Sequence, residues 1–135
     1  MDAEIGCPRP ISNGMKVLLV DDDAFLRDMY ATKFMEFGHE VEGATDAKTA
    51  FGKIKEGNYD AVLLDVIMPS QSGLELLKEI NDSGLKKNSK YIILSNQSES
   101  SDRAMAGKLG ADGYIVKAES IPSDVVKKVE EICKK

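Results

Sequence analysis

The chain has 135 residues, which suits one domain with a buried core, and no apolar stretch approaches the roughly 18 residues needed to span a bilayer. Its formal net charge at pH 7 is -5. That acidity argues against a nucleic-acid surface, which needs a basic patch, and against electrostatic docking on anionic membranes.

The two ends of the chain set the boundaries of the expected domain. Residues 1–14 contain two prolines and no strand or helix period, so we interpret them as a flexible leader, either native or added to the natural chain. They also lack the basic start and apolar segment of a secretory signal. The cysteines, Cys7 and Cys133, have no metal-ligand spacing, and a reducing cytoplasm fits them best. We therefore expect one folded domain over residues 15–135.

Five short apolar runs divide the rest of the chain. Runs of this length are typical of strands, and the wholly apolar residues 61–64 are typical of a strand that is buried on both faces. The second run is the weakest of the five. In chain order, the strands are expected at residues 16–20, 39–43, 59–64, 90–94 and 114–116.

Apolar residues recur at helical spacing after each of these runs. The first helix begins near the acids at 21–23, where negative charge is favoured, and Gly38 closes it. Pro122 is well suited to the first turn of the last helix. In chain order, the helical periods cover residues 26–37, 47–56, 73–80, 105–109 and 122–133.

Strict alternation of five strands and five helices predicts an α/β fold. The strands should form a parallel, doubly wound sheet with right-handed crossovers and helices on both faces. In such sheets the ligand site lies outside the carboxyl ends of the strands, where the strand order reverses. Functional side chains are therefore expected just after the strands.

Polar groups follow four of the five strands: the acids at 21–23, then Asp65, Ser95 and Lys117. Carboxylates gathered at one sheet edge repel one another and must take up protons or a cation. Oxygen ligands without a nearby Cys or His select a hard cation, Mg²⁺ or Mn²⁺. With the amine of Lys117 and the hydroxyl of Ser95, they would form a pocket for a phosphoryl group, leaving one carboxylate as a nucleophile.

Four motifs in this order and spacing resemble one known family. They read Val-Asp-Asp-Asp, Leu-Leu-Asp-Val-Ile-Met-Pro, Ile-Leu-Ser and Gly-Ala-Asp-Gly-Tyr-Ile-Val-Lys. Together they resemble the receiver domains of two-component response regulators, from residue 15 to the C-terminus. The resemblance implies a flavodoxin-like (βα)5 fold with a five-stranded parallel sheet, the architecture that the element count also predicts.

The resemblance implies a role for each acid of the cluster. Asp65 matches the aspartate that accepts a phosphoryl group from a histidine kinase. Asp21 and Asp22 match the acidic pair that serves the metal, with Asp65 as a further ligand. The backbone carbonyl of Ile67 matches the main-chain metal ligand. The implied cofactor is Mg²⁺ or Mn²⁺.

The resemblance also implies a switch. Ser95 matches the hydroxyl that moves to hydrogen-bond the phosphoryl group, and Lys117 matches the lysine that pairs with that group. Tyr114 matches the aromatic residue that turns inward when the hydroxyl moves.

The sequence departs from the family pattern at two places. Ala118 stands where the family usually has a proline after the lysine, often with a cis peptide. A cis bond before alanine costs about 2.5–4 kcal/mol, so this loop, and Lys117 with it, can be placed differently. Ile67 and Asn96 occupy variable positions beside the phosphoryl group, where Ile67 cannot orient a water and Asn96 narrows access. We predict slow self-dephosphorylation, over minutes or longer.

The favoured function is a phosphorylation-activated switch, not an enzyme with a separate substrate. Its only catalysis would be its own phosphoryl transfer and dephosphorylation. The expected partners are a histidine kinase or a histidine phosphotransfer protein, and a downstream protein that docks on residues 98–135. Nucleic acid and membrane are not expected partners. A phosphorelay intermediate belongs to the same class and stays open.

Two other classes also stay open. The opening Asp21-Asp22-Asp23-Ala24-Phe25 also resembles that of haloacid-dehalogenase-type phosphatases, in which the first and third acids would be nucleophile and general acid. Those enzymes need a further acidic pair beyond the lysine, where this sequence has only Glu119 and Asp124. The other alternative is a pseudo-receiver that binds partners without phosphorylation, and the complete set of site residues argues against it.

A few residues receive structural interpretations only. His39 is a lone histidine after a helix-ending glycine and is expected at the surface. Met29, Met35 and Met105 are expected in or near the core. Cys133 falls in an apolar helical stripe and is expected to be a small buried hydrophobe.

Overall fold

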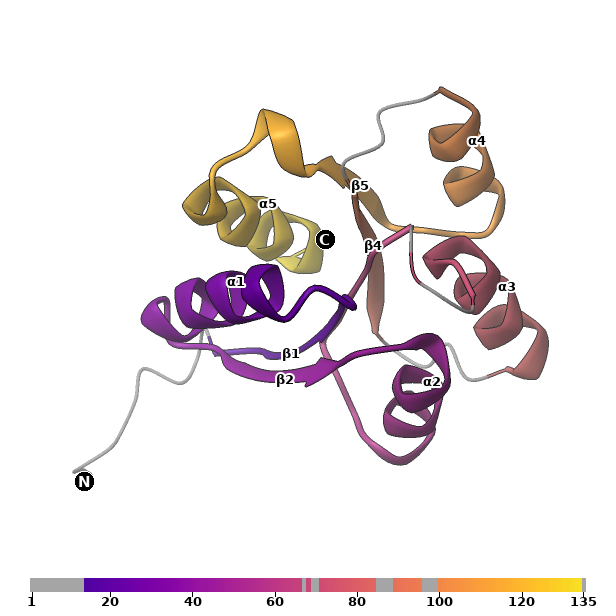
Figure 1. The fold of residues 1–135 in the computed structure, drawn as a ribbon, viewed down its shortest axis with the longest axis horizontal. Coiled ribbons are helices and arrows are strands. Elements are labelled where there is room, and N and C mark those ends of the chain that lie inside the picture. The colour runs from indigo at the N-terminus through magenta and orange to yellow at the C-terminus, as the bar shows by residue number, and fades with distance from the viewer. Residues whose placement is uncertain (1–13, 67, 69–70, 85–88, 96–99, 135) are drawn as a thin grey trace.

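The computed structural model describes residues 14–66, 68, 71–84, 89–95 and 100–134, and strands alternate with helices throughout them (Figure 1). The expected α/β class is confirmed. The strands are β1 (Lys16–Val20), β2 (Glu40–Ala44), β3 (Ala61–Leu64), β4 (Lys90–Ser95) and β5 (Gly113–Val116). The helices are α1 (Ala24–Glu36), α2 (Ala47–Glu56), α3 (Gly73–Ser83), α4 (Ser100–Lys108) and α5 (Pro122–Lys134), with a short 3-10 turn, η2 (Lys117–Glu119).

The strands form one parallel sheet in the order β2-β1-β3-β4-β5. The chain moves from β1 to one edge and then returns past β1, so the order reverses between β1 and β3. Val20 pairs with Leu64 in the register of these two strands. The residues that directly follow, Asp21 and Asp65, are therefore neighbours at the reversal point, where this class of sheet binds ligands.

Two apolar layers enclose the sheet. α1 and α5 cover one face and α2, α3 and α4 cover the other (Figure 1). Because side chains alternate across a strand, Leu63 packs toward α1 and α5 and Leu64 packs toward the opposite layer. All four residues of β3 are buried, as expected for its wholly apolar sequence. This buried central strand fixes the position of Asp65.

Side-chain caps and left-handed glycines set the helix ends. The carboxylate of Asp23 accepts hydrogen bonds from two backbone N–H groups of the first turn of α1, and that of Asp46 caps α2 by accepting one, from Thr49. Ser72 and Glu75 form a capping box at the start of α3. Gly38 follows α1 with a φ of +90°, a conformation that only glycine adopts readily. The expected helix boundary at Gly38 is confirmed.

The expected surface position of His39 is wrong, because the side chain is buried and only 4% of the residue is exposed. Its Nδ1 accepts a hydrogen bond from the backbone N–H of Met15 at 3.1 Å. The ring proton therefore lies on Nε2, which donates to the Glu130 carboxylate at 2.7 Å. His39 links the start of β1 to α5.

The interpretation of the methionines as core residues is wrong at two of the three positions. Met35 is 55% exposed and Met105 is 46% exposed, whereas Met29 packs against the α1–α5 layer. On α1 only Tyr30 and Phe34 are buried, because the helix meets the sheet along a narrower stripe than its apolar residues suggest. Cys133 is half-buried against the same layer.

No helix in the described part of the chain is long and apolar enough to cross a membrane. Of the expected leader, residues 1–13 lie outside the described residues.

Candidate functional site

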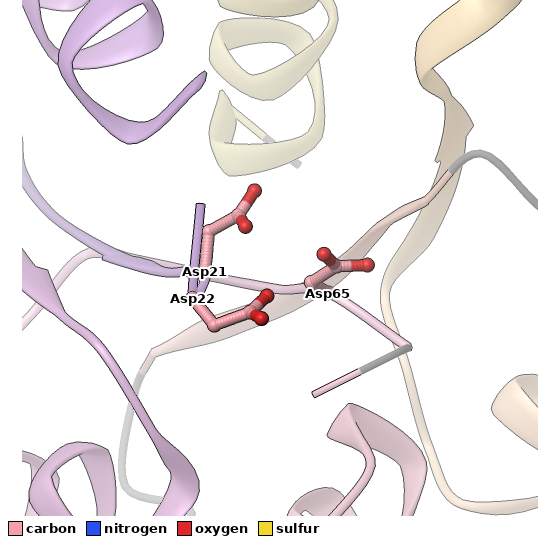
Figure 2. A group of neighbouring side chains, drawn as sticks. All are labelled: Asp21, Asp22 and Asp65. Carbon is pink, nitrogen blue, oxygen red and sulfur yellow. The ribbon is translucent and has the colours of Figure 1, made fainter. Parts of the chain in front are cut away.

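Three carboxylates share one space at the carboxyl edge of the sheet. Asp21 and Asp22 follow β1, and Asp65 follows β3 (Figure 2). One oxygen from each of the three side chains lies within 4.8 Å of the others. Asp21 is buried, Asp65 is half-buried and Asp22 is exposed. The structure thus brings together the acids that the sequence placed at this edge.

Lys117 reaches this cluster from the end of β5. Its Nζ lies 2.8 Å from Oδ2 of Asp21 and 3.5 Å from Oδ2 of Asp65. The described residues contain no cis peptide bond, and Lys117 opens the 3-10 turn η2. The alanine at position 118 therefore leaves the lysine within reach of the acids.

Charge keeps the buried Lys117 protonated. Burial lowers the pKa of its ammonium group, but the hydrogen bond to Asp21 and the charges of Asp65 and Asp21 outweigh burial. The net result is a pKa above the ordinary value for lysine. A fixed positive charge therefore stands beside the Asp65 carboxylate.

Asp21 is held from its main chain as well as its side chain. Its backbone N–H donates to the Ala44 carbonyl at 3.1 Å, and its Oδ1 accepts from the backbone N–H of Asp23 at 2.9 Å. The guanidinium of Arg27 donates to the Asp21 carbonyl at 2.8 Å. Gly43 leaves room for Arg27, because a Cβ there would stand 2.9 Å from Cδ of the arginine. No sequence pattern pointed to Arg27, since only the fold brings this α1 side chain onto β2.

Asp23 caps a helix, unlike Asp21 and Asp22. Its Oδ1 accepts the N–H groups of Phe25 at 3.0 Å and Leu26 at 3.2 Å, so this carboxylate is engaged as the cap of α1. The run of three acids therefore divides into two that face the shared space and one that starts a helix.

A pocket of about 260 Å³ opens over the cluster. Ser95, at the end of β4, is fully buried, and Leu26 adds to the lining an apolar side chain that the sequence did not predict. The lining residues are Asp21, Asp22, Asp23, Leu26, Asp65, Ser95 and Lys117. The predicted residues Asp21, Asp22, Asp65, Ser95 and Lys117 are all among them, and Tyr114 is not.

The start of α3 presses against the loop that carries Asp65. Gly73 donates its N–H to the Val66 carbonyl at 3.2 Å. A Cβ at Gly73 would stand 2.3 Å from the carbonyl oxygen of Asp65, a distance that real atoms do not tolerate. Glycine at this position therefore lets α3 begin close beneath Asp65. Ile67, the predicted main-chain metal ligand, lies outside the described residues, as does Asn96.

Tyr114 lies beside the pocket and does not line it. Ile93 pairs with Tyr114, and Ser95 pairs with Val116, in the register of β4 and β5. Side chains two residues apart share a face, so Ser95 and Tyr114 are diagonal neighbours on the face covered by α4. Tyr114 is half-buried there, with the guanidinium carbon of Arg103 4.8 Å from the centre of its ring.

The donor set fits a hard divalent cation. Three carboxylates face one ammonium group, which leaves an excess of negative charge in the pocket. The metal ligands that the described residues offer here are carboxylate oxygens, the type that Mg²⁺ and Mn²⁺ prefer, and Mg²⁺ keeps several waters when it binds. Asp22, the exposed member, leaves that side open to water.

The family profile described as the response regulator receiver domain matches residues 17–130 of the chain. Among curated proteins, the chemotaxis protein CheY of Thermotoga maritima is 37% identical over 122 residues, covering 90% of this chain and 99% of CheY. The two-component response regulator PhoP of Pseudomonas aeruginosa is 35% identical over 103 residues, covering 76% of this chain. The chain spans about half the length of PhoP and of several other matched regulators.

Solved structures agree with this pattern. The response regulator TrrA of Thermotoga maritima, in complex with Mg²⁺ and beryllium fluoride, superposes with a TM-score of 0.75 at 33% identity. The match covers 87% of this chain and 97% of TrrA. These comparisons give no support to the phosphatase alternative.

Proposed function

This chain belongs to the response regulator receiver family, and we propose that Asp65 is the residue that accepts the phosphoryl group. Receiver domains are regulatory switches of phosphorylation-activated two-component signalling, and they bind Mg²⁺ at an acidic site. They interact with histidine kinases and downstream effectors.

One observation carries the assignment of Asp65. Its carboxylate ends the buried central strand, 3.5 Å from the Lys117 ammonium group and within 4.8 Å of both other acids. Both carboxylates line the pocket and both pair with Lys117, but Asp21 is the more buried and lies closer to the ammonium group, at 2.8 Å against 3.5 Å for Asp65. Asp65 is therefore the carboxylate best placed to act as a nucleophile.

The proposed transfer proceeds in one displacement. An oxygen of Asp65 forms a bond to phosphorus while the bond from phosphorus to the donor histidine breaks, and the histidine nitrogen keeps the electron pair. Lys117 pairs with an oxygen of the incoming group. Asp21, Asp22, Asp65 and the main-chain carbonyl of Ile67 would hold Mg²⁺ or Mn²⁺, which neutralises charge on the phosphoryl oxygens.

The proposed switch uses Ser95 and Tyr114. The hydroxyl of Ser95 would donate a hydrogen bond to the phosphoryl group, and Tyr114 would turn into the space beside it. Their positions as diagonal neighbours under α4 support this coupling. A downstream protein would read the change on residues 98–135, of which 98–99 and 135 lie outside the described residues. Phosphorylation then biases two arrangements that the partner distinguishes.

We propose that the receiver domain covers residues 15–135, follows a leader at 1–14 and acts in the cytoplasm. The donor is a histidine kinase or a histidine phosphotransfer protein, and service as a phosphorelay intermediate fits the same chemistry. Because Ile67 cannot orient a water, the phosphoryl group should persist for minutes or longer in Mg²⁺. A half-life of a few seconds would refute the slow rate.

Beryllium fluoride with Mg²⁺ tests the acceptor site. We expect the amide spectrum of the wild-type protein to change on addition, and Asp65→Asn to abolish that change. Asp28→Asn is the matched control, because Asp28 is an exposed acid on α1 outside the pocket. The assignment fails if the wild-type spectrum is unaltered or if Asp65→Asn responds like the wild type. If the protein responds to beryllium fluoride but no phosphodonor phosphorylates it, the pseudo-receiver is favoured.

A further inference from the structure

Arg103 covers the ring of Tyr114. The arginine is an exposed residue of α4, and its guanidinium carbon lies 4.8 Å from the ring centre of the half-buried tyrosine on β5. This separation is within the range of a cation–π contact. The contact joins α4 to β5 next to the diagonal pair of Ser95 and Tyr114.

The position of the contact makes it sensitive to the state of Tyr114. A ring turned toward Ser95 would leave its present position 4.8 Å from the guanidinium carbon. Arg103 therefore interacts with one arrangement of the tyrosine and loses that interaction in the other. A group with such a differential interaction shifts the equilibrium between two states.

We propose that Arg103 holds Tyr114 in its half-exposed arrangement and so opposes switching until Asp65 is phosphorylated. The inference rests on the proposed function, in which Tyr114 is the switch aromatic. It adds a positioning residue on α4 that acts through Tyr114 and does not touch the phosphoryl group.

The energy of the contact between Arg103 and Tyr114 depends on how exposed the two side chains are to solvent. A cation–π contact at an exposed site shifts an equilibrium by about two- to five-fold. If the unswitched arrangement dominates without phosphorylation, removing Arg103 raises the population of the switched arrangement by that factor. The apparent affinity for a phosphoryl mimic rises by the same factor.

The test compares beryllium fluoride affinities in Mg²⁺. We expect Arg103→Ala to bind about two- to five-fold more tightly than the wild type. Lys108→Ala is the control, because it removes an exposed positive charge from the same helix. A second readout uses protein labelled with fluorotyrosine, in which the ¹⁹F resonance of Tyr114 is the one lost in Tyr114→Phe. In Arg103→Ala this resonance should shift toward its position in the wild-type protein saturated with beryllium fluoride.

A double-mutant cycle isolates the contact. The effect of Arg103→Ala should vanish when Tyr114 is already replaced by leucine. The inference is overturned if Arg103→Ala binds as tightly as the wild type or more weakly, if Lys108→Ala has an equal effect, or if the effect persists with Leu at 114. Those results leave the proposed function intact, whereas a wild-type protein that ignores beryllium fluoride overturns both.

Discussion

Lys117, which follows β5, and Asp21, which follows β1, form a buried ion pair with 2.8 Å between Nζ and Oδ2. The pair joins two strands that are not neighbours in the sheet. The Lys117 ammonium group also occupies one oxygen of Asp21, a proposed metal ligand, and so competes with the metal ion for it. Its removal should therefore affect stability and metal binding in opposite directions.

Replacing Lys117 with methionine should destabilise the metal-free protein and tighten its binding of Mg²⁺. Asp21 would lose its buried partner, which costs about 3 kcal/mol. The three acids would then face no ammonium group, so a divalent cation would meet less repulsion. Urea unfolding with and without Mg²⁺ measures both effects. Equal or weaker Mg²⁺ binding in Lys117→Met would contradict the proposed ligand set.

Replacing Gly73 with alanine should disturb the Asp65 loop. The new Cβ would meet the Asp65 carbonyl at 2.3 Å, so the loop or the start of α3 must shift. We expect weaker beryllium fluoride binding by at least several-fold and lower stability. Gly52→Ala is the matched control, because a Cβ there meets nothing within 4 Å. That change lies inside α2 and should stabilise the protein by about 0.5–1 kcal/mol. A Gly73→Ala protein with normal binding would show that the close approach is unimportant.

Replacing His39 with alanine should lower the free energy of unfolding by about 2–3 kcal/mol. The change leaves the Met15 N–H without its acceptor and opens a cavity between β1 and α5. Glu130→Gln keeps a hydrogen-bond acceptor for Nε2 and should cost far less. Chemical denaturation of both variants checks the comparison. If both variants lose only a similar, small amount of unfolding free energy, the link that His39 makes between β1 and α5 contributes little.

Burial raises the pKa of the Cys133 thiol to about 11. The folded protein keeps the thiol proton where the unfolded chain, with a pKa near 9.0, has lost it. Stability from this group is therefore complete below about pH 9 and declines as the pH rises toward 11. In a Cys7→Ser background, alkylation of the folded protein should be slow at pH 8 and accelerate up to about pH 11. Rapid alkylation at pH 8 would contradict a raised pKa.

The sequence predicted the parts of the site that follow from strand order. Asp65 ends a wholly apolar run, and parallel strands end at a common edge, so the pocket could be placed before any distance was known. Lys117 was in doubt because Ala118 replaces a proline. The structure shows that the lysine reaches the acids without it.

Other features depend on contacts that periodicity does not encode. His39 stands alone after a glycine, and its burial depends on Met15 and Glu130, which are distant in the chain. The stacking of Arg103 on Tyr114 likewise depends on how α4 docks. The apolar residues of α1 exceed the width of its buried stripe, so Met35 could not be placed from spacing alone.

The most direct test of the central claim maps the phosphorylated residue. The protein is incubated with Mg²⁺ and a small-molecule phosphodonor, the acyl phosphate is trapped by borohydride reduction, and the modified peptide is sequenced by mass spectrometry. We predict a single Mg²⁺-dependent modification at Asp65. Modification at Asp21, the nucleophile position of the phosphatase alternative, or none at Asp65 while the donor is consumed, would contradict the claim.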